Sequence, residues 1–115
     1  MWRVDAETQD IVMTRGDTPS FEIQCNTLDG EGNPVPYVPE EEDVFIFACK
    51  ESKGSEPAFI VEIPKDTMTV SFKEEYTKNL KGTKFIWEVS LNNASTGYHC
   101  TFICEKNLIL RPEVY

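Results

Sequence analysis

The hydrophobic pattern of the chain is clearest between Lys81 and Leu91, where apolar and polar side chains alternate. One of the two alternating sets is apolar throughout and comprises Phe85, Trp87, Val89 and Leu91. A repeat of two residues places such a set on one face of a β-strand, so we predict a strand over residues 83–92. Burying a side chain as large as that of Trp87 removes about 150–250 Å² from water. We therefore expect the core to form around Trp87, with Phe85 beside it.

Six further segments are apolar or alternating and are bounded by turn-forming residues. They predict strands over residues 8–14, 20–27, 43–50, 58–63, 67–73 and 99–110. Phe47 lies in the continuous apolar run at 44–49 and Phe102 lies in the last strand, and we expect both side chains in the core. Residues 29–42 are rich in glycine, proline and glutamate and predict a loop, because proline lacks the donor that a sheet ladder needs. Residues 73–80 fit one helical turn, and residues 105–107 fit a bulge in the last strand.

Seven short strands without internal repeats or a long helical pattern favour one all-β domain over residues 1–115. The predicted architecture is a seven-stranded antiparallel immunoglobulin-like β-sandwich. Antibody domains link their two sheets by a disulfide, but here only the second strand carries a suitable cysteine, Cys25. The sixth strand has Trp87 and Val89 where the partner cysteine would stand. We therefore expect hydrophobic packing alone to hold the two sheets together.

The charge balance narrows the choice of partners. The chain has 20 acidic and 11 basic residues, a net charge of −9 and a pI near 4.5. Binding to nucleic acid or to an anionic membrane surface depends on lysine and arginine, so the sequence argues against both. It shows neither a signal peptide nor an apolar run of membrane-spanning length, which predicts folding in the cytoplasm. A component of a soluble particle, or a binder of basic partners, fits this composition.

The four cysteines are Cys25, Cys49, Cys100 and Cys104, and all occupy apolar strand contexts. Two disulfides are formally possible, but buried thiols in a protein without a secretion signal are usually reduced. We predict four free cysteines. A zinc site formed by His99, Cys100 and Cys104 is the alternative, although this spacing matches none of the usual zinc patterns. No cofactor or metal is expected.

Three short motifs admit both a functional and a structural interpretation. Arg15-Gly16-Asp17 has the letters of a cell-adhesion tripeptide, but glycine followed by aspartate more often forms a turn. Asn93-Ala94-Ser95 is a glycosylation sequon, which has meaning only in a secreted eukaryotic protein. The acidic run 40–43, with Asp29 and Glu31, could gather oxygen ligands for calcium, but it lacks the regular spacing of a calcium loop. We expect a structural turn, an unmodified asparagine and a solvated acidic loop.

Catalytic signatures are weak. His99 is the only histidine and has no acidic residue close to it in sequence. The sequence has neither a nucleophile elbow nor a glycine-rich phosphate cradle, and we expect neither enzymatic activity nor a small-molecule ligand.

The segment Met13–Thr18, which contains Thr14-Arg15-Gly16-Asp17, is followed by Phe21-Glu22-Ile23. This combination resembles the opening of small domains found in phages of Gram-positive bacteria. Such domains stand at the N-terminus of baseplate upper proteins and in short virion proteins. The turn at 77–82 leading into an aromatic-x-Trp-x-Val strand, and the apolar segment 108–110, are also similar to them. The resemblance extends over nearly the whole chain as a pattern of strands and turns.

The resemblance implies a non-enzymatic virion protein, made in the bacterial host cytoplasm, that decorates or adapts a tail baseplate or capsid. Its partners would be other virion proteins and, as a homo-oligomer, further copies of itself. Sheet edges offer unpaired backbone groups for such contacts, so we expect a contact either at the first predicted strand, through Ile11 and Met13, or at the final segment, residues 108–115. Trp2 and Tyr115 near the chain ends are the expected anchoring side chains.

Two other functions stay open. An acidic decoy could occupy the basic groove of a host nucleic-acid-binding protein, which the net charge of −9 suggests. A carbohydrate-binding module is suggested by aromatic residues in loops and at the ends, namely Trp2, Tyr37, Tyr98 and Tyr115.

Overall fold

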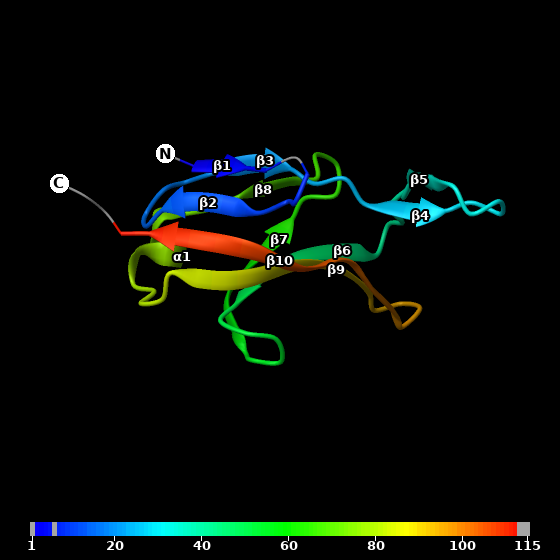
Figure 1. Cartoon of the computed structure of the whole chain (residues 1–115). Coiled ribbons are helices and arrows are strands. Elements are labelled where there is room, and N and C mark those ends of the chain that lie inside the picture. The colour runs from blue at the N-terminus through cyan, green and yellow to red at the C-terminus, as the bar shows by residue number, and fades with distance from the viewer. Residues whose placement is uncertain (1, 6, 113–115) are drawn as a thin grey trace.

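The computed structural model describes residues 2–5 and 7–112, and within them the chain forms ten strands and one short helix (Figure 1). Their bounds are β1 Trp2–Val4, β2 Ile11–Thr14, β3 Ser20–Glu22, β4 Asn26–Leu28, β5 Pro34–Pro36, β6 Asp43–Lys50, β7 Pro57–Ile63, β8 Thr69–Ser71, α1 Glu74–Lys78, β9 Lys84–Asn93 and β10 Tyr98–Arg111. The protein is therefore rich in β-structure. In the described part of the chain, no helix is long and apolar enough to span a membrane.

The long strands follow the sequence pattern closely, whereas the short ones do not. β6 has the predicted bounds, and β7, β9 and β10 each differ by one residue at one or both ends. The bulge expected near residues 105–107 lies between Ile103 and Lys106, where Glu105 has a positive φ of 56°. The helical turn expected at 73–80 is α1. Long alternating segments specify their own pairing, because a one-residue slip would expose their apolar face.

Several short segments differ from the prediction. The strand predicted at 67–73 is only β8, because the amides of Thr67 and Met68 donate to the Pro64 carbonyl in a turn, and β1 was not predicted. Local turns and changes of partner account for three further differences. The predicted strand 8–14 begins only at Ile11, since the carboxylate of Asp5 accepts the amides of Glu7 and Thr8 in a turn. The predicted strand 20–27 is split into β3 and β4, which pair with different strands. Residues 34–36, predicted as loop, form β5. Its prolines are tolerated because β5 has one neighbour, so the missing donor can face away from the ladder.

The largest sheet has six strands in the order β1-β2-β10-β9-β6-β7. Its pairs are antiparallel except for β2 and β10, which run parallel with Ile11 opposite Leu108 and Met13 opposite Leu110. The prediction of seven wholly antiparallel strands is therefore wrong. The chain leaves β2 for a second layer instead of returning in a hairpin, so β2 need not run antiparallel to its neighbour β10.

The same topology corrects the predicted edge. β2 lies between β1 and β10, and Ile11 and Met13 are 0% exposed in the core. Neither side chain is available to a partner, because both face the core, and the backbone edge of β2 is paired with β1. β10, which contains residues 108–110, lies between β2 and β9 and is not an edge either. In this sheet the outer strands are β1 and β7.

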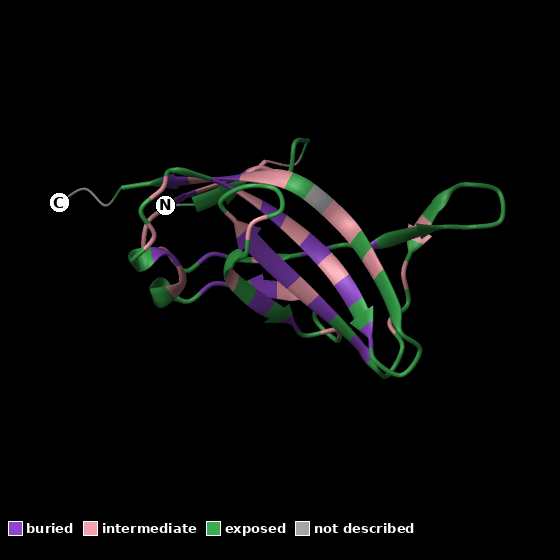
Figure 2. Ribbon diagram, turned by 90° about the horizontal axis from the view of Figure 1, so that it is seen from below, coloured by how far each residue is buried: buried purple, intermediate pink, exposed green. Residues whose placement is uncertain are grey.

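The core lies between the six-stranded sheet and the two-stranded sheet β3–β8. The rings of Phe47 and Trp87, from neighbouring strands, stack with centroids 5.3 Å apart and planes at 20°. Phe21 from β3 and Phe72, just after β8, meet Phe47 from the opposite layer at 6.3 and 5.3 Å. Phe47, Phe85 and Trp87 are at most 2% exposed. Figure 2 shows the resulting alternation of buried and half-buried positions along the long strands.

Phe102, the fourth expected core residue, is half-buried. Its ring lies 5.2 Å from that of Tyr37 and 6.2 Å from that of Phe45. It therefore packs against the periphery of the core instead of its centre.

Arg15-Gly16-Asp17 forms the corner that carries the chain from β2 into the second layer. The amide of Gly16 donates to the Thr77 hydroxyl of α1 at 2.9 Å, and a guanidinium nitrogen of Arg15 donates to the Gly82 carbonyl at 3.2 Å. The carboxylate of Asp17 accepts the amide of Thr14 at 3.1 Å. Gly16 has φ of 89°, a conformation that side chains other than hydrogen disfavour. The tripeptide is thus a structural corner, as the turn interpretation predicts.

The hairpin β4–β5 stands apart from both layers and is called the arm below. Three cross-strand pairs hold it together, and every residue of β4 is exposed. It projects from the body at the end opposite β1 and the end of β10 (Figures 1 and 2), and the Cα atoms extend over 52 Å in this elongated molecule. The acidic residues Asp29 and Glu31 lie in its tip.

The packing makes Trp87 the most sensitive position of the core. We expect Trp87→Ala to lower the free energy of unfolding by about 3–5 kcal/mol, a large share of the about 5–15 kcal/mol that a domain has. The indole Nε1 of Trp87 is buried without a hydrogen-bond partner among the described residues. Trp87→Phe removes that donor and keeps a ring on Phe47, so its loss should be roughly half or less. Urea denaturation measures both values, and equal losses in the two variants would show that the stack is not what stabilises the core.

The thiols give a second prediction. Cys25, Cys49 and Cys100 are free, and the side chain of Cys104 lies outside the described part. Burial, with a contribution from nearby Cys100, raises the pKa of Cys25 to about 11, and burial raises the pKa of Cys49 to about 12. Both therefore stay protonated and unreactive at pH 8. A thiol reagent should label neither of them in the native protein, but should count four thiols after denaturation without reductant. A count of zero would mean two disulfides.

Candidate binding groove at the base of the arm

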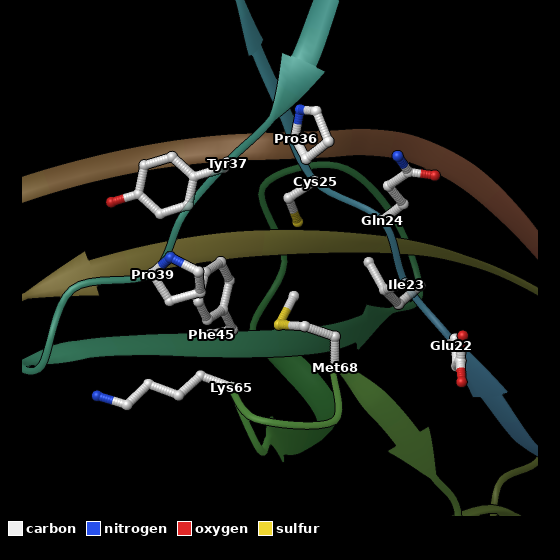
Figure 3. Close-up of a pocket in the computed structure, with 10 residues that line it drawn as sticks. All are labelled: Glu22, Ile23, Gln24, Cys25, Pro36, Tyr37, Pro39, Phe45, Lys65 and Met68. Atoms are coloured by element: carbon white, nitrogen blue, oxygen red, sulfur yellow. The ribbon is translucent and has the colours of Figure 1, made fainter.

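A groove of about 460 Å³ lies where the arm joins the body (Figure 3). Its apolar lining comes from four separate segments of the chain and comprises Ile23, Cys25, Pro36, Tyr37, Pro39, Phe45 and Met68. Glu22, Gln24 and Lys65 form a polar rim. An apolar floor with a few polar groups around it is the usual composition of a binding site.

Backbone hydrogen bonds hold the walls of the groove in place. The amide of Ile23 donates to the Met68 carbonyl at 2.8 Å, and the amide of Tyr37 donates to the Cys25 carbonyl at 2.9 Å. Met68 has a positive φ of 48°, and its amide donates to the Pro64 carbonyl at 2.7 Å. The turn after β7 therefore presents the Met68 side chain to the groove.

Tyr37 fastens the arm to the body. Its ring packs against Phe45 and Phe102 with centroids 6.1 and 5.2 Å away, and its hydroxyl donates to Asp43 Oδ2 at 2.8 Å. Burial, and then the hydrogen bond to the Asp43 carboxylate, raise the pKa of Tyr37 to about 12. The phenol thus remains a neutral donor at any physiological pH.

Asp43 is the buried centre of this polar network and is 5% exposed. In addition to Tyr37, its carboxylate accepts the amide of Glu40 at 2.7 Å and Nδ2 of Asn93 at 2.8 Å. Burial opposes the charged form, but these three donors outweigh it and hold the pKa of Asp43 below its ordinary value. Because Asp43 and Asn93 are paired in the β6–β9 ladder, the network ties the base of the arm to the main sheet.

A second hollow of similar volume shares Tyr37 with the groove and is bordered by Glu40, Thr96 and Tyr98. Tyr98 is 50% exposed. Of the four aromatic residues that suggested carbohydrate binding, the structure brings only Tyr37 and Tyr98 together, and the ring of Tyr37 is already packed against two phenylalanines. Trp2 packs on Phe21 at 6.2 Å, away from this hollow, and Tyr115 lies outside the described residues.

Acidic residues outnumber basic ones around this end of the molecule. Residues 16–49, which include the arm and the loop after it, contain eight acidic residues and no lysine, arginine or histidine. From elsewhere in the chain, Lys65 reaches this region, and its ammonium group donates to the Glu40 carbonyl at 3.0 Å and to the Glu41 carbonyl. The surface beside the groove is therefore acidic.

The other candidate sites do not assemble among the described residues, and the side chain of Cys104, the third residue of the zinc alternative, lies outside them. His99 and Cys100 are adjacent on β10 and so face opposite sides of the sheet, and His99 Nδ1 lies 2.7 Å from Asn92 Oδ1. Among the described residues no group of three or more His, Cys, Asp or Glu could hold a metal ion. Asp29 accepts two backbone amides in the arm tip, separated from the 40–43 run at the base. Asn93, the sequon residue, is 4% exposed, and its side chain donates to Asp43 and accepts from the amides of Ser95 and Thr96.

Sequence reasoning missed the groove, because its lining comes from residues far apart along the chain. Two signals pointed toward this end of the molecule: the long stretch without a basic residue, and the prolines at 34, 36 and 39. No protein-family model matches the chain, and a search of curated proteins finds no match either.

The Asp43 network gives a prediction with a defined pH dependence. In Asp43→Asn one carboxylate oxygen is replaced by an NH₂ group, which needs an acceptor. On one side it would face the Glu40 amide, which can only donate. On the other side it would face Asn93, whose Nδ2 is a donor and whose Oδ1 already accepts from Ser95 and Thr96. We expect a loss of about 1–3 kcal/mol at neutral pH. The folded pKa of Asp43 is depressed from 3.8, so its contribution is complete above about pH 5 and is lost as the pH falls through the folded pKa. Urea denaturation at several pH values should therefore show the two proteins converging below pH 3.8. A gap that stays constant down to pH 2 would contradict this assignment.

Proposed function

We propose that this chain is a non-enzymatic structural protein of a phage particle, a decoration or adaptor of the tail baseplate or capsid that acts through contacts with other virion proteins. The observation that carries the proposal is the arm. Two short strands extend into solvent from a well-packed body, with Leu28 68% exposed at the end of β4 and Val38 80% exposed just after β5.

The arm contributes little to the stability of the domain. A two-stranded hairpin is marginally stable in water, and this one has three cross-strand pairs. The structure instead fixes its base firmly, through Tyr37 and the Asp43 network. A projecting, acidic hairpin with exposed apolar side chains on a firm base is suited to contact a neighbouring subunit.

The topology supports the finer interpretation of the fold as immunoglobulin-like. The order β10-β9-β6-β7 follows the G-F-C-C′ order of variable-type immunoglobulin sheets, and β3–β8 then takes the place of the B and E strands. β1 and β2 extend the larger sheet beyond its G strand. Together with the resemblance to phage baseplate domains in the Thr14–Asp17 element, this favours a docking module over a catalytic domain.

The acidic decoy remains the second candidate, because the net charge is −9 and the arm and the loop after it carry acidic residues without a lysine or arginine. A decoy should retain a nuclease or polymerase in a pull-down from host lysate, whereas a virion component should not. No comparable observation favours a carbohydrate-binding module.

Removal of the arm tests the proposal. In the phage that encodes this chain, residues 27–35 are replaced by two glycines, and the control variant has residues 52–55 of the β6–β7 loop replaced in the same way. Circular dichroism should show that both variants fold. Mass spectrometry of purified particles should then detect the control at parental abundance and the arm variant at a tenth of that or less.

Normal incorporation of the arm variant would show that the arm is not the contact. Absence of the parent protein from purified particles would reject the virion assignment as a whole.

A further inference from the structure

We propose that the groove at the base of the arm binds an extended segment of a partner protein in which an apolar side chain is flanked by lysine or arginine. The proposal builds on the proposed function and specifies the chemistry of the partner. It rests on the apolar lining of the groove, its fixed walls and the distribution of charge around it.

The floor of the groove is suited to an apolar side chain. Ile23, Cys25 and Phe45 are buried beneath it, while Pro39 and Met68 are half-buried at its surface. Figure 3 shows Cys25, Ile23 and Met68 facing the same space, with Glu22 and Lys65 at its margins. An apolar centre inside a polar rim is the arrangement that supplies most of the energy in protein interfaces. A volume of about 460 Å³ accommodates one or two side chains of a peptide.

The groove is formed before any partner binds. Its two long walls, residues 23–25 and 37–39, are joined by the bond from the Tyr37 amide to the Cys25 carbonyl, and the Ile23 amide joins the first wall to Met68. Tyr37 is further held by Asp43 and by two aromatic rings. Fixed walls reduce the ordering cost of association, so even a short segment can bind.

The charges beside the groove select a basic partner. Glu22 lies on its rim, Glu40, Glu41 and Glu42 follow directly after Pro39, and residues 16–49 contain no basic side chain to neutralise them. Lys65 is the basic residue in the lining, and its ammonium group is bound to the carbonyls of Glu40 and Glu41. Lysine or arginine on either side of the apolar anchor would meet these carboxylates, which speeds association and makes binding sensitive to salt.

The same charges disfavour insertion of the arm of a second copy. The arm carries Asp29 and Glu31 and no basic residue, so its entry into the groove of another copy would place like charges together. The proposed occupant is therefore a different protein.

The test is an NMR titration of the isotope-labelled full chain with a capped nine-residue peptide, in which a central leucine has two lysines on each side and serines at the ends. One control peptide replaces the leucine by serine, and another replaces the lysines by glutamates. Backbone resonances of Gln24, Lys65 and Met68 should shift saturably with the first peptide. Both controls should bind at least about tenfold more weakly, and raising the salt from about 50 to 500 mM should weaken binding.

Two variants locate the site. Met68→Lys places a cation in the groove, and Ile60→Lys makes the same change at a 54% exposed position of β7 that does not line it. We expect at least a tenfold loss of affinity for the first peptide in Met68→Lys and none in Ile60→Lys. The triple variant Glu40→Gln, Glu41→Gln and Glu42→Gln leaves the apolar lining intact and should reduce both the affinity and its salt dependence.

Three results would overturn the proposal: shifts confined to other surfaces, equal binding of the serine control, or the same resonances moving on dilution of the protein alone, which would indicate a second copy. If Met68→Lys fails to fold, the triple variant still decides the matter. Peptide binding in solution is independent of incorporation into particles, so failure here would leave the virion assignment standing.

Discussion

The stack of Phe47 on Trp87 is the contact on which the rest of the structure depends. It joins the neighbouring strands β6 and β9, and from the other layer Phe21 and Phe72 close on Phe47. Cys25, Cys49 and Cys100 are free thiols and form no disulfide between the layers. The packing of these rings therefore holds the two layers together. The short strands β3 and β8, which have three cross-strand pairs, are held in place by this packing more than by their own ladder.

Contacts of Tyr37 with Phe45 and Asp43 connect the core to the base of the arm. Phe45, two residues before Phe47 on β6, packs against Tyr37, and Asp43 at the start of the same strand accepts the Tyr37 hydroxyl. The contacts with β6 therefore fix the position of the base of the arm. Among the described residues the arm itself makes no comparable contact. This division between a fixed base and an exposed hairpin underlies both functional proposals.

The sequence predicts the parts of the fold that have a strong local pattern. β6 and β9 could be recognised because their apolar residues are continuous or strictly alternate, and burial of Trp87 followed from its place in that pattern. The parallel pairing of β2 with β10 could not, since the apolar residues of Ile11–Thr14 fit an edge strand and an inner strand equally well. β5 was missed because its prolines argue against a strand unless the strand has a single neighbour. The groove depends on contacts between Ile23, Tyr37 and Met68, which no local pattern reveals.

The central claim is that the arm end of the molecule contacts another protein of the particle. Photo-cross-linking in intact phage particles tests it most directly, with a photoreactive amino acid in place of Leu28 on the arm and, as a control, in place of Ile60 on β7. The account predicts that the Leu28 position becomes cross-linked to a different virion protein, identified by mass spectrometry, and that the Ile60 position does not. Cross-links from Ile60 alone, or none from either position in particles that contain the protein, would contradict it.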